Sequence, residues 1–282
     1  MGYEMGKKKN KKPRELPEAL GLPTGGVETH AHLDMEPFAE DLDAVLDRAE
    51  ACGVARIGQV FLGPEAYEKG RGLFESRPGV FFLLGVHPHD AKGWTDETLS
   101  AMRAAFASDS RLKAVGEAGL DYYYDYSPRD VQRRVFAAQL QLACEVDRPM
   151  VVHSRDALDE TFEVLEAEGF KDRPLLWHCF GGDTAFARRV LDNGWMISIP
   201  GAVTWKKMDE LREAVEMIPM DRLVLETDCP FLAPDPWRGK RNEPAFIGFT
   251  ARAVAEAKGL PLEEIWRVTA ENATRFFRLD EE

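Results

Sequence analysis

Short apolar runs alternate with helical patterns along almost the whole chain, and this alternation restricts the fold more than any other feature of the sequence. Eight runs rich in apolar and β-branched residues are typical of strands, at 25–29, 55–61, 80–86, 113–119, 149–154, 174–179, 195–199 and 222–227. Apolar residues recur at helical spacing between them, at 38–51, 128–145, 157–168, 184–193, 206–217, 245–258 and 262–277. Strands that alternate with helices favour one α/β domain with a parallel sheet.

Two architectures fit this pattern, a closed barrel and a doubly wound open sheet. No glycine-rich phosphate loop follows the first strand, whereas polar residues that suit a functional site stand at the ends of many strands. A closed barrel brings all these strand ends to one face, and roughly 250 residues is its usual length. We therefore predict a single-domain (β/α)8 TIM barrel over residues 25–282. Residues 1–24, with Lys7–Lys9, Lys11, Lys12 and Arg14, are predicted to form a basic, disordered arm, with an arm that steers nucleic acid as the alternative.

Composition excludes several classes of protein. The net charge of -13 argues against a dedicated duplex-DNA binder with a basic face, although bound metal ions can supply local positive charge for a nucleic-acid substrate. No apolar run approaches the roughly 20 residues that a membrane span needs, so we expect no membrane partner. The four cysteines form no CxxC pair, which favours reduced thiols and a cytoplasmic location. Nothing implies an obligate protein partner.

All six histidines stand in short clusters near the ends of predicted strands, together with two carboxylates. His30 and His32 are two residues apart on an extended segment, so both rings can hold one ion, and Asp228 on the last strand is their neighbour in a closed barrel. Glu117, His153 and His178 end three consecutive strands and can hold a second ion, with Glu117 as the bridge. Two such ions, roughly 3.5–4 Å apart, would flank a water molecule. The mixed nitrogen and oxygen ligands suit Mg, Mn or Zn. The alternative is a set of buried, hydrogen-bonded histidines.

Other residues are candidates for substrate contacts. We interpret His87 and His89 as donors to a phosphate or leaving group, with extra metal ligation or a structural loop as alternatives. Arg155 is a candidate for phosphate binding or for a salt bridge at the rim. Arg238, Lys240 and Arg241 form a basic cluster beside Asp228 that suits phosphate, unless it is only a solvated loop. The run Tyr122–Tyr124 suits either base stacking or packing.

Seven short motifs, in a fixed order, resemble the TatD family of metal-dependent hydrolases. They lie at 30–34, 85–89, 115–123, 152–155, 178–182, 225–230 and 238–244. The resemblance implies an amidohydrolase-like barrel, a divalent-metal centre at His30, His32, Glu117, His153, His178 and Asp228, and hydrolysis of phosphodiester bonds in DNA. Typical members are deoxyribonucleases, often 3′ exonucleases that prefer single strands. One departure is Glu28, where the family usually has aspartate.

The sequence thus predicts a two-metal phosphodiesterase that acts on single-stranded DNA or another nucleic acid. In this hypothesis Asp228 accepts a proton from the attacking water, Glu117 holds the ions, and His87 and His89 stabilise phosphoryl charge. Metal-activated water attacks carbonyl carbon as readily as phosphorus. An amide or ester hydrolase, such as a deacylase acting on misacylated tRNA, is therefore the first alternative. A non-catalytic binding protein on an inactive barrel is the second.

Overall fold

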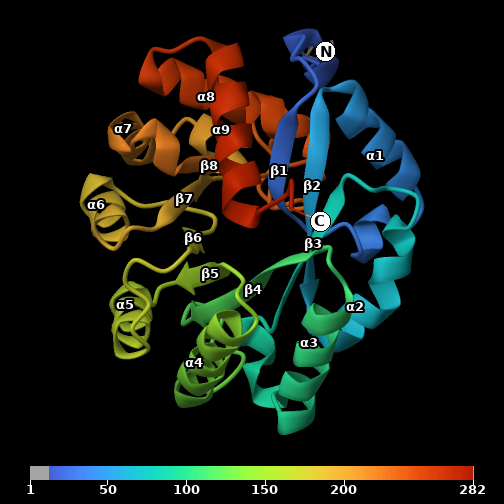
Figure 1. Cartoon of the computed structure of the whole chain (residues 1–282). Helices are drawn as coiled ribbons and strands as arrows, with labels where there is room; N and C mark the ends of the chain where they lie inside the picture. Colours follow the sequence, from blue (N-terminus) through green and yellow to red (C-terminus); the bar gives the residue numbers. More distant parts are fainter. Residues whose placement is uncertain (1–12, 282) are drawn as a thin grey trace, which may run out of the picture.

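Eight parallel strands form the centre of the molecule (Figure 1). The structure is a computed structural model that describes residues 13–281 of the 282-residue chain. The strands are β1 (Gly26–Ala31), β2 (Val54–Leu62), β3 (Val80–Gly85), β4 (Leu112–Asp121), β5 (Met150–Arg155), β6 (Leu175–Trp177), β7 (Met196–Ile199) and β8 (Leu223–Leu225). Each pairs in parallel with the next along the chain, which confirms the eight predicted strands and their order.

Strand β8 returns to β1 and nearly closes the sheet into a barrel. Ala31 and Cys229 form a parallel bridge. The backbone N–H of His32 donates to the Cys229 carbonyl at 2.9 Å, and that of Asp228 donates to the His30 carbonyl at 2.9 Å. The predicted (β/α)8 barrel is therefore confirmed. Its closure brings together the first and last strands, which both lead to predicted metal ligands.

Helices surround the strands and cover the outer face of the barrel (Figure 1). They are α1 (Leu42–Ala51), α2 (Pro64–Gly70), α3 (Asp96–Ser108), α4 (Arg129–Glu145), α5 (Leu158–Ala167), α6 (Thr184–Asp192), α7 (Asp209–Met217), α8 (Ile247–Lys258) and α9 (Leu262–Phe277). Two of them, α2 and α3, were not predicted from apolar spacing. None of the helices in the described range is long and apolar enough to cross a membrane.

The core has an inner and an outer part, and the inner part fixes where a site can lie. Inward-facing side chains fill the barrel, among them Leu83, Val151 and Val224. Helix α9 adds Ala273 and Phe277 to this inner cluster, and the Phe277 ring lies 5.0 Å from that of Phe81 near the start of β3. The end of the barrel where the strands begin is therefore packed with apolar side chains. A site can form only at the other end, where TIM-barrel enzymes carry theirs.

The segment before β1 differs from the disordered arm that the sequence predicts. Pro13–Thr24 contains a short 3-10 helix, Pro17–Leu20, and runs along the barrel. Arg14 donates from Nε to the Pro236 carbonyl at 2.9 Å, and Trp266 of α9 donates to the Pro23 carbonyl at 2.9 Å. These contacts attach the segment to the loop before α8 and to α9. Apolar residues such as Leu20 also pack on α8. The lysines at positions 7–12 lie outside the described residues.

Candidate metal centre

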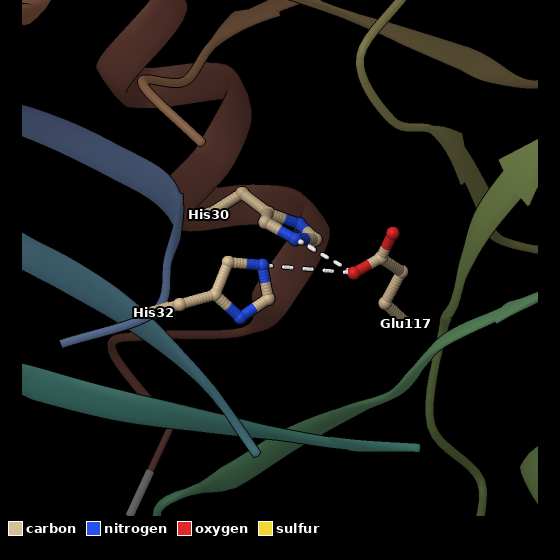
Figure 2. Close-up of side chains that lie close together, drawn as sticks. All are labelled: His30, His32 and Glu117. Atoms are coloured by element: carbon tan, nitrogen blue, oxygen red, sulfur yellow. Dashed lines mark ion pairs between the residues drawn. The ribbon is translucent and has the colours of Figure 1, made fainter. Parts of the chain in front are cut away.

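Glu117 of β4 stands at the centre of the histidine cluster. Its Oε2 lies 3.4 Å from His30 Nε2 and 3.7 Å from His32 Nε2 (Figure 2). Its Oε1 lies 2.7 Å from His153 Nδ1 and 3.4 Å from His178 Nε2. Four of the predicted ligands therefore meet at one buried carboxylate, two at each of its oxygens.

A local irregularity of β4 directs Glu117 into the barrel. Strict alternation from the inward-facing Ala114 would put Gly116 and Ala118 inside and Glu117 outside. The pairing of β4 with β5 shifts register between Val115 and Ala118, and this shift lets Glu117 reach the histidines. No such shift is needed on β5 and β6, where His153 and His178 each stand two residues after the inward-facing Val151 and Leu176.

Asp228 completes the predicted set from the end of β8. Its Oδ1 lies 3.4 Å from His32 Nε2. Asp228 has a φ of 56°, in the left-handed region that non-glycine residues rarely adopt, and its backbone N–H is held by the His30 carbonyl. Such backbone strain is concentrated at functional sites.

The donor atoms in this cluster fit divalent metal ions. His30 Nδ1, His30 Nε2 and His32 Nδ1 are buried and have no hydrogen-bond partner among the described residues. Buried polar atoms without partners are unfavourable, so their presence in the cluster needs a reason. Ligand atoms of His30, His32 and Glu117 lie within 4.8 Å of one another, as do those of His87, Glu117 and His153. Imidazole nitrogens with carboxylate oxygens suit first-row metals.

Charge coupling keeps the carboxylates of the cluster ionised. Burial alone would raise the pKa of Glu117, but the neighbouring His178 and His87 hold it well below its usual value. Burial would likewise lower the pKa of His178, but the carboxylates of Glu226 and Glu117 raise it well above the usual value. Burial would also raise the pKa of Asp228, but the hydrogen bond with His32 and the nearby His178 lower it. The centre therefore presents anionic oxygens to a cation at neutral pH.

Two further carboxylates orient the histidines, and the sequence reasoning missed both. Glu226 is fully buried and lies with Oε2 3.0 Å from His178 Nδ1. Asp121 lies with Oδ2 3.2 Å from His153 Nε2 and 3.0 Å from His89 Nε2. Glu226 stands two residues before Asp228, and Asp121 four residues after Glu117. The same even spacing that links His30 to His32 could have identified both.

Glu28 braces the two strands that carry the first ligands. Its Oε1 accepts the backbone N–H of His30 at 2.7 Å and that of Thr227 at 3.1 Å. Burial raises the pKa of this carboxyl to about 8. The longer side chain that replaces the family's usual aspartate thus joins β1 to the end of β8 beside the metal centre.

Comparison with known proteins decides the family. The profile of the TatD related DNase family matches residues 27–278. The chain belongs to this family. It is 40% identical to YabD of Bacillus subtilis, an uncharacterized metal-dependent hydrolase, over 90% of this chain and 99% of that protein. It is 35% identical to the 3′-5′ ssDNA/RNA exonuclease TatD of Erwinia tasmaniensis, over 88% of this chain and 98% of that one. The crystal structure of the TatD homologue YJJV of Escherichia coli superimposes with a TM-score of 0.84 at 28% identity, covering 90% of this chain and 98% of that one. The chain is thus a metal-dependent hydrolase with a TIM-barrel fold.

In this TatD-family barrel, His87 and His89 lie at different depths. His87 is buried, with Nε2 3.6 Å from Glu117 Oε1, so it lies inside the cluster rather than at its mouth. Burial is the main cause that lowers the pKa of His87 well below its usual value. His89 is more exposed and faces Asp121. The Ser127 hydroxyl donates to the His89 carbonyl at 2.8 Å and so fixes the backbone of this residue.

The predicted phosphate-binding cations are not equally available. Arg241 forms two hydrogen bonds of 2.7 Å with Asp41 and lies over the Phe38 ring, so its side chain is committed to a structural contact. Arg238 lies over the Trp205 ring and is exposed, as is Lys240. Arg155 is exposed at the end of β5. Three of the four cations that the sequence suggested therefore face solvent.

Proposed function

We propose that this chain is a 3′-5′ exonuclease that acts on single-stranded nucleic acid with two divalent metal ions. One observation carries the proposal: the two oxygens of Glu117 face two different sets of histidines. His30, His32 and Asp228 would hold one ion, and His153 and His178 the other, with Glu117 between them. Two Erwinia relatives, each a 3′-5′ ssDNA/RNA exonuclease TatD by name, support the choice of substrate.

The residues around the proposed ions have distinct roles. Bound Mg²⁺, Mn²⁺ or Zn²⁺ would polarise the phosphate and lower the pKa of a water molecule. Asp228 is ionised at neutral pH because His32 lowers its pKa, and it accepts the proton that the attacking water loses. His89 contacts the phosphoryl oxygens, and Asp121 orients its ring for this role. His87 is buried with Nε2 facing Glu117, so it supports the ion site instead of the substrate.

We also place the protein in the cytoplasm. Cys52, Cys144, Cys179 and Cys229 are all free thiols, as is typical of a reducing compartment. Cys179 and Cys229 are neighbours of proposed ligands, and burial raises the pKa of both thiols well above the usual value. Possible ligand atoms of Cys179, His178 and Asp228 also lie within 4.8 Å of one another.

A substrate panel tests the proposal. The purified protein, after chelation and reloading with Mg²⁺, Mn²⁺ or Zn²⁺, is given a 5′-labelled single-stranded oligonucleotide, bis-p-nitrophenyl phosphate and an aminoacyl ester. We expect a ladder of products shortened from the 3′ end and metal-dependent cleavage of the small diester. Rapid cleavage of the aminoacyl ester with no attack on either phosphodiester would replace the nuclease with a deacylase.

A further inference from the structure

Exposed aromatic side chains of the described residues gather at the mouth of the metal centre. Three of them, Tyr123, Tyr124 and Tyr126, lie on the loop between β4 and α4 and are 58%, 44% and 57% exposed. We call these three the tyrosine cluster. The rings of Tyr124 and Tyr126 are stacked, with centroids 5.2 Å apart and an angle of 22° between their planes. Large apolar surface that stays in solvent beside a catalytic centre indicates a binding site.

One buried carboxylate fixes the tyrosine cluster relative to the proposed ligands. Asp121 Oδ1 accepts the backbone N–H of Tyr123 at 3.1 Å and that of Tyr124 at 2.9 Å. Its other oxygen contacts His153 and His89. The loop is therefore tied to the same group that orients a proposed metal ligand. The His89 ring packs against the tyrosine cluster, with its centroid 5.2 Å from that of the Tyr124 ring and 4.9 Å from that of the Tyr126 ring.

A positive charge accompanies the exposed rings. The Arg155 guanidinium carbon lies 4.1 Å from the centroid of the Tyr123 ring and 4.9 Å from that of Tyr124. In a chain with a net charge of -13, a guanidinium on an aromatic surface beside the active site favours an anionic partner that also carries flat rings. Another exposed ring, Phe231 (51% exposed), lies near the histidines, with its centroid 6.3 Å from that of His32.

We propose that the tyrosine cluster stacks unpaired nucleobases of the substrate strand beside the scissile phosphate, while Arg155 binds the backbone. This inference rests on the nuclease function proposed above. Every nucleobase has a flat face, so stacking on tyrosine tolerates any sequence, as an exonuclease requires. Bases in a duplex are already covered on both faces by their neighbours. The cluster therefore selects single strands and gives a physical reason for that preference.

The test compares variants that remove the rings with variants that keep them. Tyr124→Ala/Tyr126→Ala removes both stacked rings, Tyr124→Phe/Tyr126→Phe keeps them, and Leu73→Ala removes an equally exposed apolar side chain from the turn before β3. Stacking of one base is worth about 1–3 kcal/mol, so the alanine pair should lower kcat/KM for a single-stranded oligonucleotide about 5-fold to 150-fold. The phenylalanine pair and the Leu73→Ala variant should stay within about twofold of the parent.

Abasic substrates identify the partner of the rings. Oligonucleotides with one abasic site, placed at successive positions from the 3′ end, keep the phosphates and lose one base. With the abasic site at one position, kcat/KM of the parent should fall by the factor that the alanine pair shows on the intact strand. The kcat/KM of the alanine pair should not fall further on that substrate. If the alanine pair instead has the same ratio of kcat/KM to the parent on every abasic substrate, base stacking is overturned and the rings have a structural role.

Binding separates this inference from the nuclease proposal. Fluorescence anisotropy of a labelled single strand with chelator present requires no turnover. If the parent binds the strand more tightly than the alanine pair but cleaves no phosphodiester with any ion, only the nuclease proposal fails. If the parent degrades single strands and the alanine pair matches it in both binding and rate, only the stacking proposal fails.

Discussion

Replacing Glu226 with glutamine should weaken metal binding while the barrel stays folded. Glu226 Oε2 contacts His178 Nδ1 at 3.0 Å, and Oε1 accepts the backbone N–H of Cys179 at 2.8 Å. Opposite a carboxylate, Nδ1 of His178 carries the ring proton, which leaves Nε2 free to face a cation near Glu117. A glutamine amide has one oxygen for these two donors, so one N–H would face the amide NH2 group.

The substitution should have two separate effects, one on folding stability and one on metal affinity. A buried N–H that loses its acceptor costs about 1–3 kcal/mol of stability. Loss of a carboxylate that orients a metal-binding histidine weakens metal affinity about 10-fold to 100-fold, which corresponds to about 1.4–2.7 kcal/mol. We therefore expect the apparent Kd for Mn²⁺ to rise by about one to two orders of magnitude. At saturating Mn²⁺, kcat should change much less, because Glu226 is fully buried and its contacts are with His178 and the Cys179 backbone.

The assay is hydrolysis of bis-p-nitrophenyl phosphate across a Mn²⁺ titration, with calorimetric titration of the ion as an independent measure. Glu166→Gln, an exposed position on α5, is the matched control for the same change of charge. Thermal unfolding of the chelated proteins checks that Glu226→Gln is folded. An unchanged Mn²⁺ titration in a folded Glu226→Gln variant would show that this carboxylate does not orient His178 for metal binding.

Four further substitutions test other parts of the structure. Glu117→Gln should lower kcat by at least about two orders of magnitude and leave the purified protein with fewer than two ions by elemental analysis, and normal metal content would refute the bridging role. Arg241→Ala breaks the contact with Asp41 and should lower stability by roughly 1 kcal/mol without altering oligonucleotide affinity. Lys240→Ala should instead weaken binding and reduce the slope of log affinity against log salt by about 0.7, and the reverse pattern would contradict the assignment of Arg241. Because the pKa of Glu28 is raised from 4.5 to about 8 on folding, the chelated protein should lose stability as pH rises from about 5 to 8, and denaturant unfolding of Glu28→Gln should show little of that loss.

The sequence predicted the barrel and the gathering of histidines and carboxylates at one end of it, because both depend on short-range patterns. Each strand is an apolar run, and parallel strands must all end at one face, so residues that follow the runs meet without any knowledge of distances. His153 and His178 illustrate this, since alternation alone places them inside the barrel. Closure of β8 on β1 then brings Asp228 to His32, as expected from the order of the strands.

Features that depend on long-range contacts could not be predicted in this way. The inward position of Glu117 requires the register shift in β4. Gly116, with a φ of 139°, indicates an irregularity at this point, but the sequence alone does not say which side chain it turns inward. Arg241 pairs with Asp41, which lies 200 residues earlier in the chain. The basic cluster in the sequence therefore divides into two exposed cations, Arg238 and Lys240, and one cation with a structural role. Pro13–Thr24 looked like a disordered arm because its contacts, such as that of Arg14 with Pro236, are with the far end of the chain.

Charge links these observations into one account of metal dependence. Glu117, Asp121, Glu226 and Asp228 all contact histidines of the cluster, and two divalent ions would match four carboxylate charges beside neutral imidazoles. Protons are the alternative counter-charge: burial would lower the pKa of His153 and His178, but the surrounding carboxylates raise both. Metal ions and protons therefore compete for the same nitrogens, and ion affinity must fall as pH decreases through these raised pKa values. The carboxylates that orient the histidines are thus also the reason why the centre requires cations at neutral pH.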